Sequence, residues 1–180
     1  MNVDPFLFMG DLFSIPLVES SIDVVYTSHT IEPNAGKEKE ALAELVRVAR
    51  KYVILLEPAY ELAGAEAQAR MEKHGYIRRL HAAAEELGLH ILEYRLFDLC
   101  SNPLNPTGLM VIKLDKEVTT PHPQTPPIMC PISKTPLIHK KGHAFTKEGL
   151  LVYPIIDGVP CLLSENAVIA THYLDNFELR

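Results

Sequence analysis

The sequence has 180 residues, a net charge of −6, and 47% hydrophobic against 22% charged residues. This balance is typical of a globular chain that forms one ordinary domain, with or without a small module, and it argues against disorder. The negative charge argues against a direct nucleic-acid surface built on bulk positive charge. No apolar run approaches the roughly 20 residues that span a bilayer, and no signal-peptide pattern begins the chain. The three cysteines are few, odd in number and far apart, which favours a reducing compartment, so we expect a cytoplasmic protein.

Short apolar runs alternate with helical stretches in the first part of the chain, which is typical of βα units and a mostly parallel sheet. Residues 22–26 and 52–56 are predicted strands, and a helix is predicted over 38–50 between them. The second strand is expected to end at Glu57-Pro58, because proline has no amide hydrogen and restricts the residue before it.

Two helical stretches follow, over residues 61–73 and 77–87, and Gly88 is a suitable residue to end the second. Further strands are predicted over 90–97 and 109–114. Since no helix separates these last two strands, we expect an antiparallel hairpin at an edge of the sheet.

The texture of the sequence changes near residue 120. Residues 116–127 contain four prolines and predict a semi-rigid linker. The linker separates a domain over residues 1–115 from a module over 128–180, in which we expect short strands and turns and then a helical tail.

Four motifs of the first domain occur in a fixed order: GDLFSIPL at 10–17, SIDVVY at 21–26, SHTIE at 28–32 and ELVRV at 44–48. In this order and at this spacing they resemble the second half of the class I S-adenosylmethionine-dependent methyltransferases of the type 11-like group. The resemblance covers roughly residues 6–114. It implies an α/β fold with an incomplete Rossmann-like sheet, comprising the region of that family's strands 3 to 7.

The resemblance also implies a cofactor site at the carboxyl ends of the strands, where ligands of open α/β sheets bind. Asp11 would accept a hydrogen bond from the adenine amino group, and Leu12 would offer its backbone amide to the ring. Thr27, Ser28 and His29 would line the floor beneath the methionine portion. From the residues alone, Asp11 could equally be a turn-forming residue, and His29 a packed or surface histidine.

No residue of the sequence identifies a general base, so the catalytic residues stay unassigned. Glu57 follows a strand and could face substrate, cap a helix or lie in solvent.

The cofactor loop of the family is a glycine-rich turn after its first strand, and no Gly-x-Gly pair occurs in this sequence. In the family's strand order 3-2-1-4-5-7-6, the two missing strands lie between the third and the fourth. We therefore expect the fourth strand to present an open edge. A truncated chain, a second polypeptide that supplies the missing half, and a degenerate paralogue all remain open.

The second module has two motifs, CPISKTPL at 130–137 and YPIIDGVPCLL at 153–163. They resemble small zinc-ribbon-like proteins and an activator subunit that pair with methyltransferases of tRNA, ribosomal RNA and translation factors. The resemblance implies a small α+β module that packs against a methyltransferase domain, often by extending its sheet edge. Asp157-Gly158 is also a strong turn signal between apolar runs.

Zinc is not expected in this module, because a structural zinc site needs four closely placed thiolate or imidazole ligands. Ser133 stands where the second cysteine of the pair would be, and Cys161 lies in an apolar strand. His139 and His143 match no standard spacing with Cys130.

The sequence therefore predicts methyl transfer from S-adenosylmethionine by a protein whose complete form includes a missing N-terminal half. The ribbon-like module favours a macromolecular substrate from translation, by analogy alone. The alternative is a non-catalytic interaction or scaffold protein that binds or activates a methyltransferase. We expect a second copy or a second polypeptide to complete the sheet, and no membrane partner. Another nucleotide-binding α/β protein is disfavoured, since phosphate-binding glycines and a Walker lysine are absent.

Overall fold

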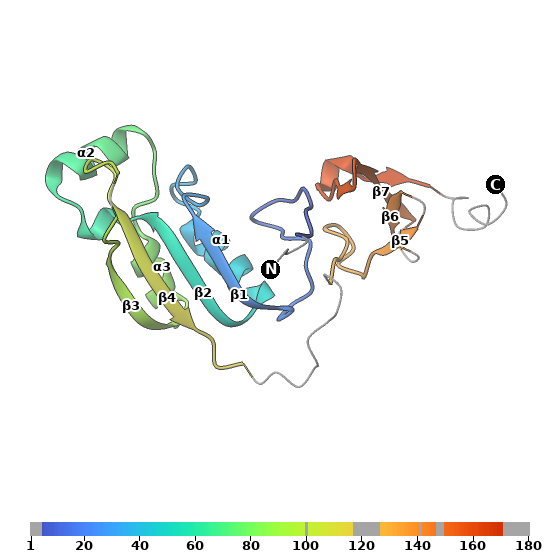
Figure 1. The fold of residues 1–180 in the computed structure, drawn as a ribbon, viewed down its shortest axis with the longest axis horizontal. Helices are drawn as coiled ribbons and strands as arrows, with labels where there is room; N and C mark the ends of the chain where they lie inside the picture. Colours follow the sequence, from blue (N-terminus) through green and yellow to red (C-terminus); the bar gives the residue numbers. More distant parts are fainter. Residues whose placement is uncertain (1–4, 100, 117–126, 141, 147–149, 171–180) are drawn as a thin grey trace. The chain divides into compact units, whose positions relative to one another are not determined.

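The computed structural model describes residues 5–99, 101–116, 127–140, 142–146 and 150–170. Residues 19–121 form one compact unit, here named the sheet unit, and residues 1–18 with 122–180 form a second, here named the ribbon unit (Figure 1). The predicted linker residues 117–126 and the expected helical tail at 171–180 lie outside the described residues.

The strands and helices expected over residues 22–114 are present, and the fold is mixed α/β. The segment before Asp11, which the resemblance placed at the family's third strand, forms no strand of this sheet in the described residues. In chain order its elements are β1 (Ile22–Ser28), α1 (Glu38–Val48), β2 (Ala49–Pro58), a 3-10 turn (Tyr60–Leu62), α2 (Ala65–Lys73), α3 (Leu80–Glu86), β3 (His90–Leu96) and β4 (Thr107–Lys113). Within the described part of the chain, no helix combines the length and the apolar character that crossing a bilayer requires.

The strands of the sheet unit are arranged in the order β1-β2-β4-β3. Strands β1 and β2 are parallel and are joined through α1, whereas β4 runs antiparallel to both β2 and β3. The expected hairpin of the last two strands is confirmed, with β3 at the edge. At the opposite edge, β1 pairs with β2 and with no other strand of the described residues.

The core of the sheet unit lies on the sheet face that α1 and α3 cover, behind the strands in Figure 1. Val53 pairs with Ile112 and Leu55 pairs with Met110, and all four side chains are at most 1% exposed. Helix α1 meets this face with the apolar stripe that its sequence predicts, formed by Ala41, Leu42, Leu45 and Val48. On β1, Tyr26 and Val24 belong to the other face and are 72% and 45% exposed.

The amine of Lys116 caps the carboxyl end of α1. Its Nζ donates to the backbone oxygens of Val46 at 2.6 Å and Ala49 at 3.0 Å, and to the hydroxyl of Ser20 at 3.1 Å. A cation at this end also complements the helix dipole. The side chain therefore ties the segment after β4 to the first helix of the unit.

Replacing Lys116 with methionine is expected to lower the free energy of unfolding by about 1–2 kcal/mol, because the carbonyls lose a charged donor while the aliphatic stem stays. Urea denaturation measures the change. The control is Lys51→Met, since Lys51 is 58% exposed and pairs only loosely, at 3.3 Å, with Asp23. Its expected change is within about 0.5 kcal/mol, and an equal loss in both variants would contradict the cap.

The ribbon unit is built of short strands and turns, as expected. Its strands are β5 (Ile138–Lys140), β6 (His143–Phe145), β7 (Leu151–Ile156), β8 (Val159–Pro160) and β9 (Val168–Ile169). The order is β5-β6-β7-β8, and β9 pairs with β7. Asp157 and Gly158 join β7 to β8 with φ angles of 50° and 81°, so this two-residue turn signal is confirmed.

The first described residues belong to the ribbon unit, whereas the sequence placed them in a domain over residues 1–115. The backbone amide of Met9 donates to Pro160 at 2.9 Å, and its carbonyl accepts from Leu162 at 2.8 Å. These bonds pair the segment with the strand after the Asp157-Gly158 turn. Backbone pairing over a long sequence separation therefore assigns this segment to its unit.

Candidate functional site

The loop that follows β1 is anchored by the carboxylate of Glu57, a side chain that is 1% exposed near the end of β2. Its Oε1 accepts the amide of Thr30 at 3.0 Å, and its Oε2 accepts the amides of Ile31 and Glu32, each at 3.2 Å. Three consecutive amides around one carboxylate make a strong, charge-assisted contact. Three roles were considered for Glu57: contact with substrate, capping of a helix and exposure to solvent. The side chain is buried and holds the loop, so contact with substrate and exposure to solvent do not apply.

A second set of polar side chains meets on this loop. His29 has a φ of 50°, and its Nδ1 pairs with Oε2 of Glu32. On the other side of the ring, Nε2 lies 2.9 Å from the hydroxyl of Thr107. The remaining carboxylate oxygen of Glu32 accepts from the amide nitrogen of Asn105 at 3.1 Å. We name these four residues the His29 cluster.

The sheet brings the parts of the His29 cluster together at one end. The loop after β1 carries His29, and the first residue of β4, Thr107, pairs with Pro58 at the end of β2. The next residue of β4, Gly108, lies opposite Glu57. Strand ends that are distant in sequence therefore meet where ligands of open α/β sheets bind.

The His29 cluster forms a chain of carboxylate, imidazole and hydroxyl. The side chain of His29 is 37% exposed and that of Glu32 is 13% exposed. A carboxylate beside Nδ1 favours the tautomer with its hydrogen on Nδ1, which leaves the lone pair of Nε2 free to accept a proton. Chemically, such a chain can hold or take up a proton at Nε2.

The His29 cluster also keeps unused polar capacity. Oδ1 of Asn105 is buried and finds no hydrogen-bond partner in the described residues. Buried polar atoms are rarely left unsatisfied in folded proteins, so this oxygen is an exception within the cluster.

Three of the residues expected to bind cofactor are consecutive at the end of β1. Ser28 and His29 are exposed there. Thr27 pairs with Leu55, faces the helix-covered side of the sheet and is 5% exposed. It therefore lies beneath the surface that Ser28 and His29 expose. Its Oγ1 is buried and has no hydrogen-bond partner in the part of the chain that the structure describes.

The other two expected residues, Asp11 and Leu12, belong to the ribbon unit. Oδ1 of Asp11 accepts the amide of Phe13 at 2.9 Å, and its backbone oxygen accepts the amide of Ser14 at 3.1 Å. Asp11 thus forms a turn, which is one of its two expected roles.

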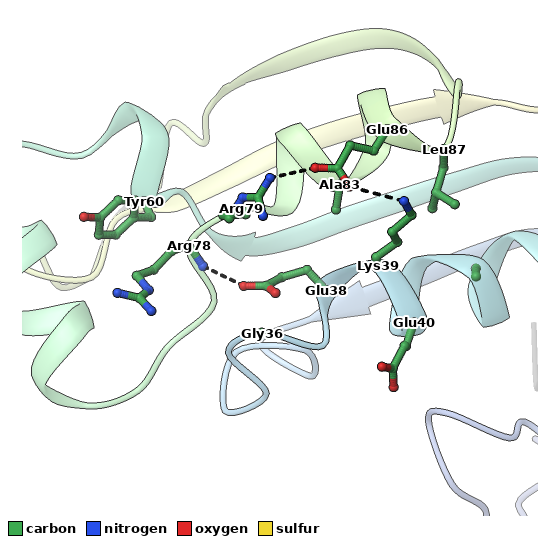
Figure 2. Close-up of a pocket in the computed structure, with 11 residues that line it drawn as sticks. Gly36, Glu38, Lys39, Glu40, Tyr60, Arg78, Arg79, Ala83, Glu86 and Leu87 are labelled. Atoms are coloured by element: carbon green, nitrogen blue, oxygen red, sulfur yellow. Dashed lines mark hydrogen bonds and ion pairs between the residues drawn. The ribbon is translucent and has the colours of Figure 1, made fainter.

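A groove of about 750 Å³ lies between α1 and α3, on the helical side of the sheet unit (Figure 2). Three of its charged side chains are paired with one another: Glu86 contacts Lys39 at 3.2 Å and Arg79 at 2.6 Å. The hydrogen bond from Lys39, with the charges of Lys39 and Arg79, holds the pKa of Glu86 below its usual range. At the other end, the carboxylate of Glu38 accepts the amide of Arg78 at 3.0 Å, and the guanidinium of Arg78 points away from it. The side chains of Glu38, Glu40 and Arg78 also line the groove.

In the ribbon unit, the thiol of Cys130 is buried. Its Sγ lies 3.1 Å from the hydroxyl of Tyr153 and 3.3 Å from the amide of Ser133. The hydroxyl of Ser133 meets Thr135 at 2.8 Å instead. Within the described ranges, no three His, Cys, Asp or Glu side chains gather in a way that could hold a metal.

Burial raises the pKa of Cys130, but hydrogen bonds from Ser133 and Tyr153 outweigh it, so the pKa lies below its ordinary value of 9.0. The same contact and burial raise the pKa of Tyr153. Because the folded chain releases the thiol proton before the unfolded chain does, the contribution of Cys130 to stability rises with pH up to the ordinary thiol range.

Replacing Tyr153 with phenylalanine is expected to raise the pKa of Cys130, since one donor to the thiolate is lost, and to lower stability by about 1 kcal/mol. Thiolate absorbance during a pH titration measures the pKa, in a chain with serine at positions 100 and 161. The control is Tyr26→Phe, which alters an exposed tyrosine of the sheet unit. An unchanged thiol titration in Tyr153→Phe would show that the hydroxyl does not stabilise the thiolate.

The sequence missed three members of the His29 cluster. Glu32 was within a recognised motif but had no assigned role, and Asn105 and Thr107 lie between the strands predicted over residues 90–97 and 109–114, where no site was expected. Their proximity to His29 arises from strand pairing, which no local pattern reveals. No protein-family model, no curated protein and no solved structure matches this chain, so its function has to be argued from its own residues.

Proposed function

We propose that this chain is part of an S-adenosylmethionine-dependent methyltransferase of class I, with its site at the carboxyl ends of β1 and β2. The order β1-β2-β4-β3 carries the proposal. It equals the 4-5-7-6 end of the family's strand order, and the SIDVVY and ELVRV motifs lie on the matching elements. The sparse cysteines, two of them buried and free, support a cytoplasmic location.

S-adenosylmethionine would supply an electrophilic methyl group on a sulfonium. Ser28 and His29 would line the floor of the site, with Thr27 supporting them from below. The chain would act chiefly by holding the acceptor in position, since orientation supplies much of the rate enhancement in such reactions. The glycine-rich turn would be supplied by a second polypeptide. A macromolecule of translation is the substrate class that the ribbon-like module favours.

Isothermal titration of the full chain with S-adenosylhomocysteine tests the proposal. We expect saturable one-to-one binding, which His29→Ala weakens about tenfold by removing a side chain from the floor of the site. The control is Asp98→Ala, which removes a carboxylate that is 84% exposed and should leave the affinity unchanged. No heat from a folded sample would contradict cofactor binding by this chain alone.

A non-catalytic interaction protein is the second candidate, and the open edge of β1 favours it. Edge strands carry unpaired amides and carbonyls that can pair with a strand of another chain. A lysine in place of Val24 should then abolish association with the completing partner or with a second copy, as measured by sedimentation. Association without any binding of S-adenosylhomocysteine would favour this candidate over the first.

A further inference from the structure

Resting on the proposed methyl transfer, we propose that His29 accepts the proton that the methyl acceptor releases, and that Glu32 is the residue that positions its ring. The acceptor then belongs to a defined chemical class: a hydroxyl or amine whose reacting atom carries a removable hydrogen. An acceptor that is already a thioether or a tertiary amine has no proton to give, and it would have no use for His29.

The ring of His29 is held from both sides. Nδ1 pairs with the Glu32 carboxylate, and the second oxygen of that carboxylate is fixed by Asn105 at 3.1 Å. The backbone of Glu32 is fixed as well, because its amide donates to Glu57 and its carbonyl accepts the amide of Ile77 at 3.0 Å. A carboxylate so constrained can set the tautomer of the imidazole, as in other carboxylate–histidine pairs that act on a nucleophile.

The hydroxyl of Thr107 marks where the acceptor would bind. It lies 2.9 Å from Nε2, which is hydrogen-bond distance. With hydrogen on Nδ1 of the ring, the hydroxyl is the donor and Nε2 the acceptor. The side chain of His29 is 37% exposed, so a donor from solvent or from a substrate can reach the same nitrogen. A bound hydroxyl or amine would replace Thr107 on Nε2, or donate to Thr107 while Thr107 donates to Nε2.

The proton balance follows from this geometry. As methyl transfer proceeds, the acceptor atom uses an electron pair to form its new bond to carbon, and the carbon–sulfur pair leaves with the sulfur. The acceptor's O–H or N–H bond breaks, and its proton goes to Nε2. The imidazolium that results is stabilised by the carboxylate of Glu32.

The chain contains a matched pair for comparison. Nδ1 of His81 lies 3.6 Å from Oε2 of Glu85 on the surface of α3, and the His81 ring stacks on Tyr94 with centroids 4.6 Å apart. This distance is too long for a hydrogen bond, and the Glu85 side chain is 64% exposed. The Glu85 carboxylate should therefore not fix the tautomer of His81.

Nitrogen NMR of the full chain with ¹⁵N-labelled histidine tests the arrangement without any substrate. At neutral pH we expect His29 in the tautomer with hydrogen on Nδ1 and a lone pair on Nε2. We expect His81 as a mixture of the two neutral tautomers. Glu32→Gln should shift His29 toward a mixture of the two neutral tautomers. Glu85→Gln should leave the tautomer of His29 unchanged. Hydrogen fixed on Nε2 of wild-type His29 would overturn the proposal, because that nitrogen could not accept a proton.

Carbethoxylation by diethyl pyrocarbonate, mapped by mass spectrometry, tests whether Nε2 is a reactive base. Glu32→Gln should slow the reaction of His29 about tenfold, through the loss of a charged hydrogen bond. Thr107→Val should speed the reaction of His29, because the hydroxyl no longer covers the lone pair of Nε2. Since Thr107 lies on β4 and outside the loop, this variant keeps the test available if Glu32→Gln does not fold. Equal rates for His29 in wild type and Thr107→Val would overturn the proposal.

The two proposals fail in different ways. If S-adenosylhomocysteine does not bind while the tautomer and the reactivity are as expected, the methyl-transfer function is wrong and the basic site remains. If it binds and His29 has the opposite tautomer, the function stands and the proton acceptor is wrong.

Discussion

Replacing Glu57 with alanine is expected to lower the free energy of unfolding by about 3–5 kcal/mol, the range seen when a buried, fully bonded charge is removed and its partners are left unpaired. The amides of Thr30, Ile31 and Glu32 all donate to this carboxylate. Glu57→Gln should lose less, about 2 kcal/mol, because one carbonyl oxygen still accepts while the amide nitrogen faces a donor. Urea denaturation measures the losses, and hydrogen exchange at the three amides reports where they arise.

The matched control for Glu57 is Glu66→Ala, at an exposed position in the first turn of α2. A change within about 0.5 kcal/mol is expected there. If Glu57→Ala were as stable as Glu66→Ala, or if the three amides kept their protection, the carboxylate would not be what holds the loop. Because the loop carries His29, Glu57→Ala should also shift His29 from the tautomer with hydrogen on Nδ1 toward a mixture of the two neutral tautomers.

Introducing serine at Gly108 is expected to destabilise the sheet unit by about 2–3 kcal/mol through overpacking. A Cβ at this position would lie 2.8 Å from the Cβ of Ala59 and 3.5 Å from the backbone oxygen of Arg95. Neither neighbour can yield as the end of a flexible side chain could. Since Gly108 follows Thr107 and lies opposite Glu57, the strain falls directly on the His29 cluster.

The same substitution at Gly64 serves as the control, measured in the same thermal and urea denaturation series. A Cβ at Gly64 meets no atom within 4 Å, and its φ of −72° suits any residue. Gly64 is the N-cap of α2, where serine is favoured, so a neutral or slightly positive change is expected. Equal effects at the two positions would contradict a specific clash at Gly108.

Much of the sheet unit could be predicted from the sequence because its signals are local. The apolar run before Thr27 predicted β1, and the periodicity over residues 38–50 predicted α1. Glu57-Pro58 predicted the end of β2, since proline cannot donate to the sheet. The absence of a helix before residues 109–114 predicted the terminal hairpin. Each of these features depends on residues that are close together in the sequence.

The candidate site could be predicted only in part, because its contacts join distant segments. The position of His29 at a strand end was evident from the sequence. The role of Glu57 was not, since its three amides lie 25 to 27 residues earlier. Thr107 lies 78 residues after His29, and a turn rich in proline gives no sign of that contact. Pairing of strands creates the cluster, and composition and periodicity do not encode it.

The order β1-β2-β4-β3 has a consequence for how the chain is made. Strand β4 lies in the middle of the sheet, yet it is the last of the four to leave the ribosome. Until residues 107–113 emerge, β3 has no strand to pair with and one edge of β2 stays open to other nascent chains. Closure of the sheet, the arrival of Thr107 at His29 and the capping of α1 by Lys116 therefore come together, late in synthesis. The nascent sheet unit thus exposes unpaired strand edges for most of its translation, until its final strand is in place.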